Sequence, residues 1–157
     1  MEKRKEKTIT TNRKARYDYH ILDRIEAGIA LTGTEVKSLR EGKASLIDAY
    51  ARIDDDEIWL ISCHISEFKQ GSIFNHEPRR KRKLLLHKAQ IKRLNGKVIE
   101  KGLTLIPLRL YFSGPYIKVE IGVCRGKQQY DKRKTIKERE AKREIERGMS
   151  SGRKKNG

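Results

Sequence analysis

The strongest candidate for catalytic chemistry in this sequence is Glu35-Val36-Lys37, which matches the E-x-K half of a metal-dependent nuclease site. Asp23 or Asp48 could supply the second carboxylate that shares the metal ion. The motif works on a strand, where residues i and i+2 point the same way. Thr32 lies three residues before Glu35, however, and this spacing predicts a helix that begins with a capping box. On a helix the two side chains diverge by about 200°, so we favour a structural role for Glu35.

Two groups of basic residues could bind phosphates. The block Arg79 to Lys83 leads directly into Leu84-Leu85-Leu86, so its five cations are attached to an apolar strand rather than to a free linker. We interpret this block as a phosphate-binding patch, with a solvated loop as the alternative. In the segment Arg13 to Tyr19, three cations stand beside two tyrosines, a combination typical of sites for structured RNA. The tyrosines either stack on bases or pack against the core.

Positive charge extends along the whole chain and is densest at its end. The formal net charge is +17, and residues 125–157 hold thirteen Lys and Arg against five Asp and Glu. Such an excess favours a polyanionic partner, bound through phosphate neutralisation and counterion release. Because this last segment has too few apolar residues to build a core, we predict a basic tail that is disordered alone and folds on nucleic acid.

The composition argues against a membrane protein, a secreted protein and a metalloprotein. No apolar run approaches the roughly 20 residues of a spanning helix, and no signal peptide follows the charged start. Cys63 and Cys124 lie far apart within apolar strand patterns, which predicts buried, reduced thiols in a cytoplasmic protein. The four histidines show no metal-ligand spacing, so we expect no metal and no cofactor.

The length predicts one folded domain with an extension at each end. We assign residues 1–11 to a flexible basic arm, residues 12–124 to the folded domain and residues 125–157 to the basic tail. No additional apolar face calls for a partner chain, so we expect a monomer.

Apolar and polar residues alternate with period two through most of the folded domain. A strand over residues 25–31, preceded by another over 17–22, leaves Glu26 pointing away from the core. Residues 49–53 and 58–65 are predicted to be strands that flank an acidic turn.

The second half of the domain continues this pattern. The alternation within residues 103–112 slips at Ile106-Pro107, which predicts a bulge or an edge, and residues 117–123 form the last strand. About six short antiparallel strands favour a small closed or partly open barrel, so the fold class is mainly β.

Two short helices are predicted between the strands. The first covers residues 33–41 and stops at Gly42. The second covers residues 88–94 and ends at Asn95-Gly96, with a further short turn possible before Gly102.

Five motifs in order resemble those of the SsrA-binding proteins (small protein B) of bacteria. The similarity extends from about Asn12 to Arg133. The motifs are residues 12–19 (NRKARYDY), 26–29 (EAGI), 32–40 (TGTEVKSLR), 78–87 (PRRKRKLLLH) and Gly126 to Arg133.

The resemblance implies an OB-like RNA-binding barrel, formed by residues 12–124, with two or three short flanking helices. Proteins of this family are not enzymes. They bind the tRNA-like domain of transfer-messenger RNA and, with elongation factor Tu, deliver it to ribosomes stalled on messages without a stop codon. The basic tail enters the empty message channel and becomes helical near the decoding centre.

The resemblance also assigns roles to residues. Glu26, Leu85 and His87 look like part of the face that meets the tRNA-like domain, and an outward Glu there would accept hydrogen bonds from a base edge and so confer specificity. The supporting contacts to the same RNA are Asn12, Arg13, Arg16, Tyr17, Arg82, Lys83 and Lys127. Tyr130 resembles the aromatic residue that stacks on a decoding-centre base. The tail residues expected at small-subunit ribosomal RNA are Tyr130, Asp131, Lys132, Arg133, Lys134 and Lys137.

Two departures from the family pattern concern the tail. Gln128 replaces a frequent second lysine, and only Ile145 and Met149 provide apolar side chains in the last part of the chain. The similarity therefore implies little about docking beyond about Arg139. A more general alternative is a ribosome-associated barrel protein that resembles an initiation factor and has no preference for the tRNA-like domain.

Overall fold

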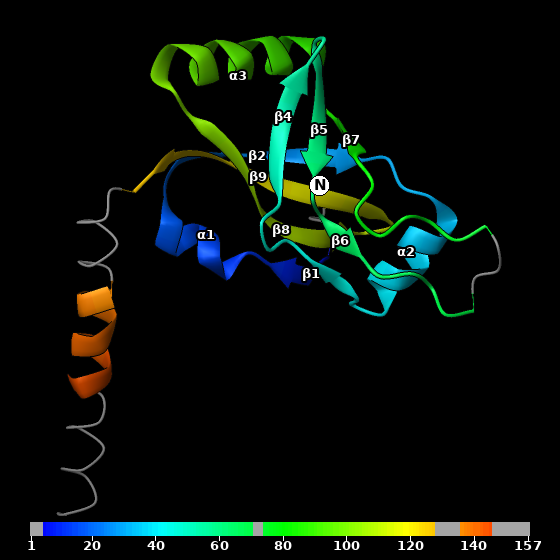
Figure 1. Cartoon of the computed structure of the whole chain (residues 1–157), viewed down its shortest axis with the longest axis horizontal. Coiled ribbons are helices and arrows are strands. Elements are labelled where there is room, and N and C mark those ends of the chain that lie inside the picture. The colour runs from blue at the N-terminus through cyan, green and yellow to red at the C-terminus, as the bar shows by residue number, and fades with distance from the viewer. Residues whose placement is uncertain (1–4, 71–73, 128–135, 146–157) are drawn as a thin grey trace, which may run out of the picture. The chain divides into compact units, whose positions relative to one another are not determined.

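The structure is a computed structural model that describes residues 5–70, 74–127 and 136–145 (Figure 1). Its contacts divide the chain into a first unit that ends at Gly126 and a second that begins at Lys127. The described part of the first unit is an antiparallel β-barrel with three helices, which confirms the predicted mainly β fold.

Six antiparallel strands close the barrel in the order β8-β4-β5-β7-β2-β9, and β9 pairs with β8 again. These strands are β2 (Tyr19–Ile29), β4 (Tyr50–Asp54), β5 (Glu57–Ile61), β7 (Arg82–Leu85), β8 (Thr104–Ser113) and β9 (Tyr116–Gly126). The short strands β3 (Ala44–Ser45) and β6 (His64–Ile65) form a separate two-stranded sheet. Closure leaves the six-stranded ring without an unpaired edge of the kind that open sheets expose.

Residues 6–11 differ from their predicted role as a flexible arm. They form β1 (Glu6–Thr11), which pairs with the second half of β8, beyond the position where β4 pairs with it. Threonine and isoleucine have high strand propensity, and the part of β8 that extends beyond its pairing with β4 satisfies the backbone groups of this segment.

The barrel interior is filled by apolar side chains from every strand of the ring. The largest apolar core side chains that are almost completely buried are Ile58, Leu60, Leu84, Leu110, Val119 and Ile121 on these strands, and Leu39, Leu46 and Ile65 elsewhere in the core. Removing such side chains from water is the main source of stability in a domain of this size. The predicted buried, free thiols are confirmed, and burial raises the pKa values of Cys63 and Cys124 to about 11.

A bulge in β8 confirms the predicted slip in alternation near Pro107. Pro107 pairs with Ile121 and Arg109 pairs with Glu120, so Leu108 is the additional residue. Leu108 packs in a second, smaller apolar cluster below helix α1 (Arg13–Asp18). The bulge changes the phase of the strand, so that Leu110 lies in the barrel core and Arg109 contacts Tyr111 outside it.

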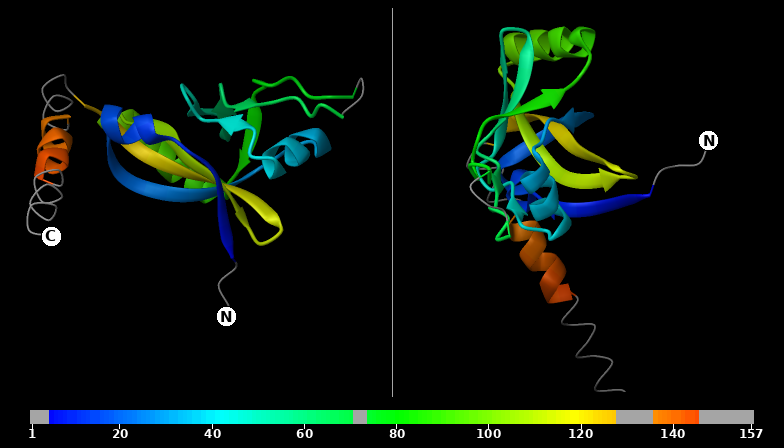
Figure 2. Two further views of the ribbon diagram at one scale, coloured as in Figure 1. Left: turned by 90° about the horizontal axis from the view of Figure 1, so that it is seen from below. Right: turned by 90° about the vertical axis from the view of Figure 1, so that its right-hand side faces the viewer.

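The helices differ in how well the sequence predicted them. Helix α2 (Gly33–Arg40) begins at the expected residue, ends one residue before the predicted position 41, and has the expected capping box. Helix α3 (Lys88–Lys101) continues through Asn95-Gly96 to Gly102, because Ile91, Leu94 and Val98 form one apolar stripe against the core. Helix α1 was not predicted. Figures 1 and 2 show α2 and α3 at opposite ends of β5.

In the second unit, residues 136–145 are helical, and every described side chain there is exposed. This helix differs from the tail predicted above, which was expected to be disordered in the absence of RNA. Lys, Arg, Glu and Ala have high helix propensity, and charges of opposite sign recur three or four residues apart. Local propensity therefore accounts for this helix without any packed face.

Candidate nucleic-acid interface

A shallow depression lies on the outside of the barrel where β7, β2 and β9 run side by side. Its volume is about 400 Å³, and Gly28 of β2 pairs with Leu85 on one side and with Lys118 on the other. The lining residues are Glu26, Gly28, Leu85, Leu86, His87, Gln90 and Lys118. The structure therefore brings together Glu26, Leu85 and His87, although Glu26 and His87 are 61 positions apart in the sequence.

The apolar floor of this depression depends on strand alternation in β7. Arg82 and Leu84 are buried, whereas Lys83 and Leu85 face outward, and Leu85 is 52% exposed. A Cβ atom on Gly28 would lie only 3.2 Å from Leu85 Cβ. Gly28 thus allows Leu85 to lie close against β2 and to present an apolar surface of the kind on which a base or a ribose can pack.

Glu26 points away from the core, as predicted, and its side chain is 50% exposed. Its Oε2 accepts a hydrogen bond from the hydroxyl of Tyr111, and its Oε1 lies 3.9 Å from Lys118 Nζ. The carboxylate is held at two points and still faces solvent. It can accept a further hydrogen bond from a ligand.

His87 and Gln90 form the rim of the depression at the start of α3. His87 is exposed, and its backbone N–H donates to Gln90 Oε1 at 3.1 Å. The backbone N–H groups at the start of α3 give this rim a partial positive charge. Cationic Lys118, the helix start and anionic Glu26 create a mixed surface rather than a purely basic one.

The block Arg79 to Lys83 is not the single phosphate-binding patch that the sequence predicted. Arg82 is completely buried, Lys81 covers the ring of Trp59 at 4.2 Å, and Lys83 forms an ion pair with Glu57 at 3.1 Å. The assignment of Arg82 as an RNA contact is therefore corrected: its guanidinium has no access to a ligand. Lys83 remains 44% exposed and shares the outward phase of β7 with Leu85.

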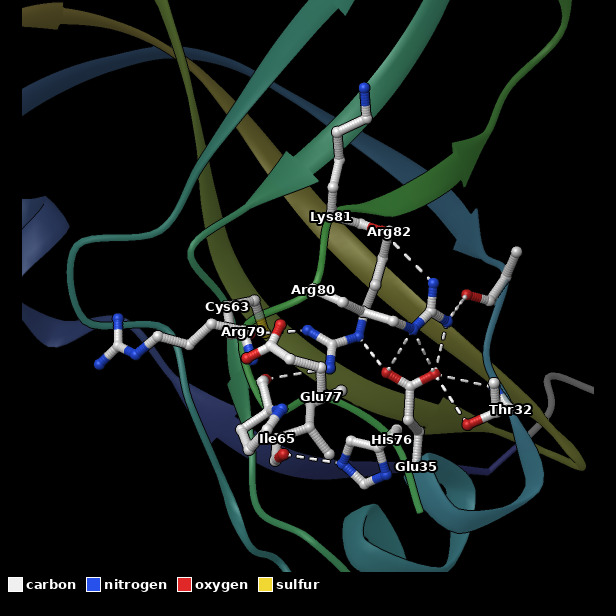
Figure 3. A network of polar contacts seen from close by, with 12 residues as sticks. Thr32, Glu35, Cys63, Ile65, His76, Glu77, Arg79, Arg80, Lys81 and Arg82 are labelled. Atoms are coloured by element: carbon white, nitrogen blue, oxygen red, sulfur yellow. Dashed lines mark hydrogen bonds and ion pairs between the residues drawn. The ribbon is translucent and has the colours of Figure 1, made fainter. Parts of the chain in front are cut away.

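Arg82 belongs to a buried ionic cluster around Glu35 (Figure 3). Glu35 of α2 accepts hydrogen bonds from Arg82 Nε and from Arg80 Nη2, the latter at 2.5 Å. Arg82 also donates to the carbonyl oxygens of Cys63, at 2.6 Å, and Pro78, at 3.1 Å. Every cationic nitrogen thus has an anionic or carbonyl partner, which is the condition under which a buried ion pair is tolerated.

The cluster also determines the charge state of Glu35. Burial alone would raise the pKa of Glu35, but hydrogen bonds from Arg80, Thr32 and Arg82 outweigh burial and lower it. The backbone N–H of Thr32 donates to Glu35 Oε1 at 2.8 Å, which completes the capping box. Glu35 is therefore an ion that ties α2 to the loop before β7.

This geometry removes the basis of the nuclease hypothesis. Glu35 has a fully buried side chain whose oxygens are occupied by Arg80, Arg82 and Thr32. Asp23 and Asp48, the proposed second carboxylates, form ion pairs with Lys97 and Lys14 instead. Within the described residues, no three His, Cys, Asp or Glu side chains gather in a way that could hold a metal ion.

Asn12 is also a structural residue rather than an RNA contact. It is only 9% exposed, and its Nδ2 donates to the carbonyl of Pro107 at 3.0 Å. Its Oδ1 accepts from the backbone N–H of Ala15 at 3.2 Å, which caps α1. Asn12 therefore fixes α1 to the bulge in β8. It supports the interface through this helix, on which Arg13 and Arg16 are exposed and Tyr17 is half-buried.

A second cleft, of about 260 Å³, separates α1 from the outer face of the barrel. Arg16 of α1, Arg24 of β2 and Arg109 of β8 line it together with Glu120. Arg24 and Arg109 both bind Glu120, at 3.1 and 3.0 Å. The cleft has more positive than negative charge and opens beside a helix that the sequence already indicated as basic.

Several residues of this surface were missed by the sequence analysis. β-sheet register places Lys118, Arg24 and Tyr111 next to Glu26, Leu85 or Arg16, and the start of α3 places Gln90 at the rim of the depression. Outward phase in the predicted strand 117–123 would have identified Lys118 as a surface cation. The contact between Tyr111 and Glu26 leaves no local sequence signal, because the two residues are far apart in the chain.

Most predicted tail contacts lie outside the described residues, namely Tyr130, Asp131, Lys132, Arg133 and Lys134. Lys137 is exposed on the helix of residues 136–145, and Lys127 is half-buried at the start of the second unit. No helix of the described chain is both long and apolar enough to cross a membrane.

The fold and the depression define a class of protein, a small closed β-barrel with a mixed charged and apolar outer face. Comparisons with known proteins identify the family. The model of the family "SmpB protein" matches residues 9–151. The chain therefore belongs to the SmpB protein family.

Individual relatives cover nearly the whole chain. An SsrA-binding protein of Carboxydothermus hydrogenoformans is 58% identical over 144 residues, which span 92% of this chain and 97% of that protein. An SsrA-binding protein of Acidothermus cellulolyticus is 60% identical over 143 residues, or 91% of this chain and 90% of that protein. A solved structure described as "tmRNA-SmpB: a journey to the center of the bacterial ribosome" is 54% identical with a TM-score of 0.64, over 76% of this chain and 85% of that one.

Proposed function

We propose that this chain is a non-enzymatic RNA-binding adaptor of trans-translation. In this role the barrel binds the tRNA-like domain of transfer-messenger RNA and delivers that RNA to stalled ribosomes. The basic tail occupies the empty message channel near the decoding centre, where it contacts small-subunit ribosomal RNA.

One observation carries the proposal. Glu26, Leu85 and His87, which the family resemblance assigns to one RNA-binding face, line one depression in this structure together with Lys118. Membership of a family whose curated relatives are SsrA-binding proteins supports the choice of RNA.

The chemistry of the depression suits an RNA with an exposed base or sugar. Leu85 offers an apolar surface, whereas Lys118 and the start of α3 attract a phosphate. Glu26 repels phosphates and accepts hydrogen bonds from a base amino group or a 2′-hydroxyl. An RNA fits this surface only if a hydrogen-bond donor, rather than a phosphate, lies next to Glu26. This requirement selects RNAs whose shape places a donor at that position.

The remaining parts of the proposal follow from the family. The chain acts as a monomer in the cytoplasm, and elongation factor Tu accompanies the RNA in the delivery complex. Tyr130 stacks on a base of the decoding centre, while Asp131, Lys132, Arg133, Lys134 and Lys137 contact the surrounding ribosomal RNA.

The division of labour between barrel and tail can be tested by a truncation after Gly126, which keeps β9 complete. The truncated chain should retain most of its affinity for the isolated tRNA-like domain and lose rescue of stalled ribosomes in a reconstituted translation assay. The matched control is a full-length chain with Lys132, Arg133, Lys134 and Lys137 replaced by Gln, which should have the same two properties. Equal loss of both activities in the truncated chain would contradict the proposal.

A competition assay separates this function from that of a general ribosome-associated barrel protein. Labelled tRNA-like domain bound to the full-length chain is challenged with unlabelled tRNA-like domain, bulk tRNA and ribosomal RNA. Displacement by the tRNA-like domain at much lower concentration supports the adaptor function. Equal displacement by all three RNAs would favour the general binder.

A further inference from the structure

Tyr111 links the proposed RNA-binding face to an ionic network on the outer surface of the barrel. It lies on β8, pairs with Lys118 of β9, and is 1% exposed. Its hydroxyl extends past β9 and donates a hydrogen bond to Glu26 Oε2 on β2. A buried phenol thus holds one oxygen of a carboxylate that is itself half-exposed.

A second contact, on the face of its aromatic ring, also restrains Tyr111. The guanidinium carbon of Arg109 lies 3.9 Å from the ring centroid, a close cation–π contact. Arg109 is held by Glu6 of β1 at 2.9 Å and by Glu120 of β9 at 3.0 Å. Because both carboxylates restrain the guanidinium, the phenol beneath it has little freedom to rotate.

The hydroxyl of Tyr111 is a permanent donor in this arrangement. Burial raises the pKa of Tyr111, and the hydrogen bond to Glu26 raises it further. The phenol therefore remains protonated at physiological pH. It directs Oε2 toward β8 and leaves Oε1 facing the depression, 3.9 Å from Lys118 Nζ.

The orientation of the Glu26 carboxylate matters because a carboxylate at most positions of an RNA-binding surface weakens RNA binding. A freely rotating glutamate would repel neighbouring phosphates and would lose side-chain entropy on binding. A restrained one can accept a single well-placed hydrogen bond from RNA, and a charge-assisted bond of this kind is among the stronger ones.

We propose that Tyr111, braced by Arg109, is a positioning residue that fixes Glu26 for recognition of one hydrogen-bond donor on the bound RNA, a base amino group or a 2′-hydroxyl. This inference rests on the proposed function, because it assumes that Glu26 contacts RNA. Tyr111 itself is buried and touches no ligand. Its effect is transmitted through Glu26 and appears as discrimination between RNAs rather than as general affinity.

A double-mutant cycle in the full-length chain tests this inference. Tyr111→Phe removes only the hydroxyl, Glu26→Ala removes the carboxylate, and the third variant carries both changes. Affinities for the isolated tRNA-like domain and for bulk tRNA are measured at fixed salt concentration. Tyr50→Phe is the matched control, because Tyr50 on β4 is 38% exposed and does not line the depression.

Tyr111→Phe should weaken binding of the tRNA-like domain roughly tenfold, the usual effect of losing a hydrogen bond to a charged group, and should leave affinity for bulk tRNA nearly unchanged. In the Glu26→Ala background, the same change should cause no further loss of affinity for the tRNA-like domain.

Tyr50→Phe should have the same affinities as the unmodified chain. Thermal unfolding of each variant checks that all are folded during the assay, and Arg109→Gln, which releases the ring but keeps the hydroxyl, replaces Tyr111→Phe if that variant is unfolded.

The possible failures are distinguishable. Wild-type affinity in Tyr111→Phe, or an equal loss in the presence and absence of Glu26, would overturn the positioning role and leave the proposed function intact. Wild-type affinity in Glu26→Ala would remove Glu26 as an RNA contact and the positioning role with it. If the unmodified chain shows no preference for the tRNA-like domain, the proposed function itself fails.

Discussion

Glu35 and Glu26 show how one residue type takes opposite roles in the same barrel. Glu35 has no exposed side-chain surface and is surrounded by Arg80, Arg82 and Thr32, whereas half of Glu26 faces solvent beside Lys118. All the hydrogen-bonding capacity of Glu35 is used within the protein. Glu26 keeps an oxygen available. Burial and saturation of partners, rather than residue type, separate the ionic cluster that stabilises the fold from the surface that can bind RNA.

The largest expected effect is on stability at the Glu35 cluster. Glu35→Ala leaves the buried guanidinium of Arg82 without its counter-ion and should lower the free energy of unfolding by about 3–5 kcal/mol. Glu26→Ala should change it by less than about 0.5 kcal/mol, as is usual for exposed positions. Urea unfolding followed by circular dichroism measures both. Glu41→Ala, at an exposed ion pair with Lys43, is the control and should also have little effect. A small effect of Glu35→Ala would show that Arg82 finds other partners.

The next comparison uses two neighbouring leucines of β7. Leu84 is 1% exposed in the core and Leu85 is 52% exposed in the depression. Leu84→Ala should destabilise the barrel by about 2–5 kcal/mol through the cavity it leaves. Leu85→Ala should leave unfolding almost unchanged and weaken binding of the tRNA-like domain by roughly tenfold, because its effect is confined to the interface. Equal effects of the two changes on stability would show that Leu85 is a core residue.

The same contrast explains which features the sequence could predict. Period-two alternation predicted β4, β8, β9 and the outward direction of Glu26, and the Thr32 to Glu35 spacing predicted α2. These signals are local. The predicted strands 17–22 and 25–31 are the single strand β2, and the predicted strand 58–65 is divided into β5 and β6. The inward direction of Arg82 was missed because three consecutive leucines hide the phase of β7.

Other errors came from signals that nearby residues override. Asn95-Gly96 is a common helix stop, yet Val98 packs against the core and extends α3 past it. The hydrogen bond from Tyr111 to Glu26 depends on register across three strands, which a single sequence does not specify. Local elements of the candidate site were therefore predictable, whereas its long-range contacts were not.

A pH titration of stability sharpens the comparison between the two glutamates. Because the pKa of Glu35 is lowered from its ordinary value of 4.5, the ionised cluster stabilises the fold fully above about that pH. This contribution is lost as the pH falls through the lowered pKa of the folded state. Urea midpoints measured from pH 7 to pH 3 should therefore fall less steeply for Glu35→Gln than for the unmodified chain. Glu41→Gln should follow the unmodified chain, and an unchanged slope in Glu35→Gln would contradict an ionised Glu35.

The smallest expected effect concerns the cleft between α1 and the barrel, which is neither buried like the Glu35 cluster nor built around an exposed leucine like the depression. Arg24 shares Glu120 with Arg109, and Arg16 lies across the cleft on α1. If this cleft receives one phosphate of the tRNA-like domain, Arg16→Gln and Arg24→Gln should each reduce the slope of log affinity against log salt by about 1 and weaken binding only a few-fold.

Arg52→Gln, at an exposed arginine of β4 that is not part of the cleft, is the control and should keep the original slope. Because a phosphate contact carries no sequence information, the affinities for the tRNA-like domain and for bulk tRNA should be affected equally. A selective loss for the tRNA-like domain would instead place the cleft with Glu26 among the residues that determine specificity.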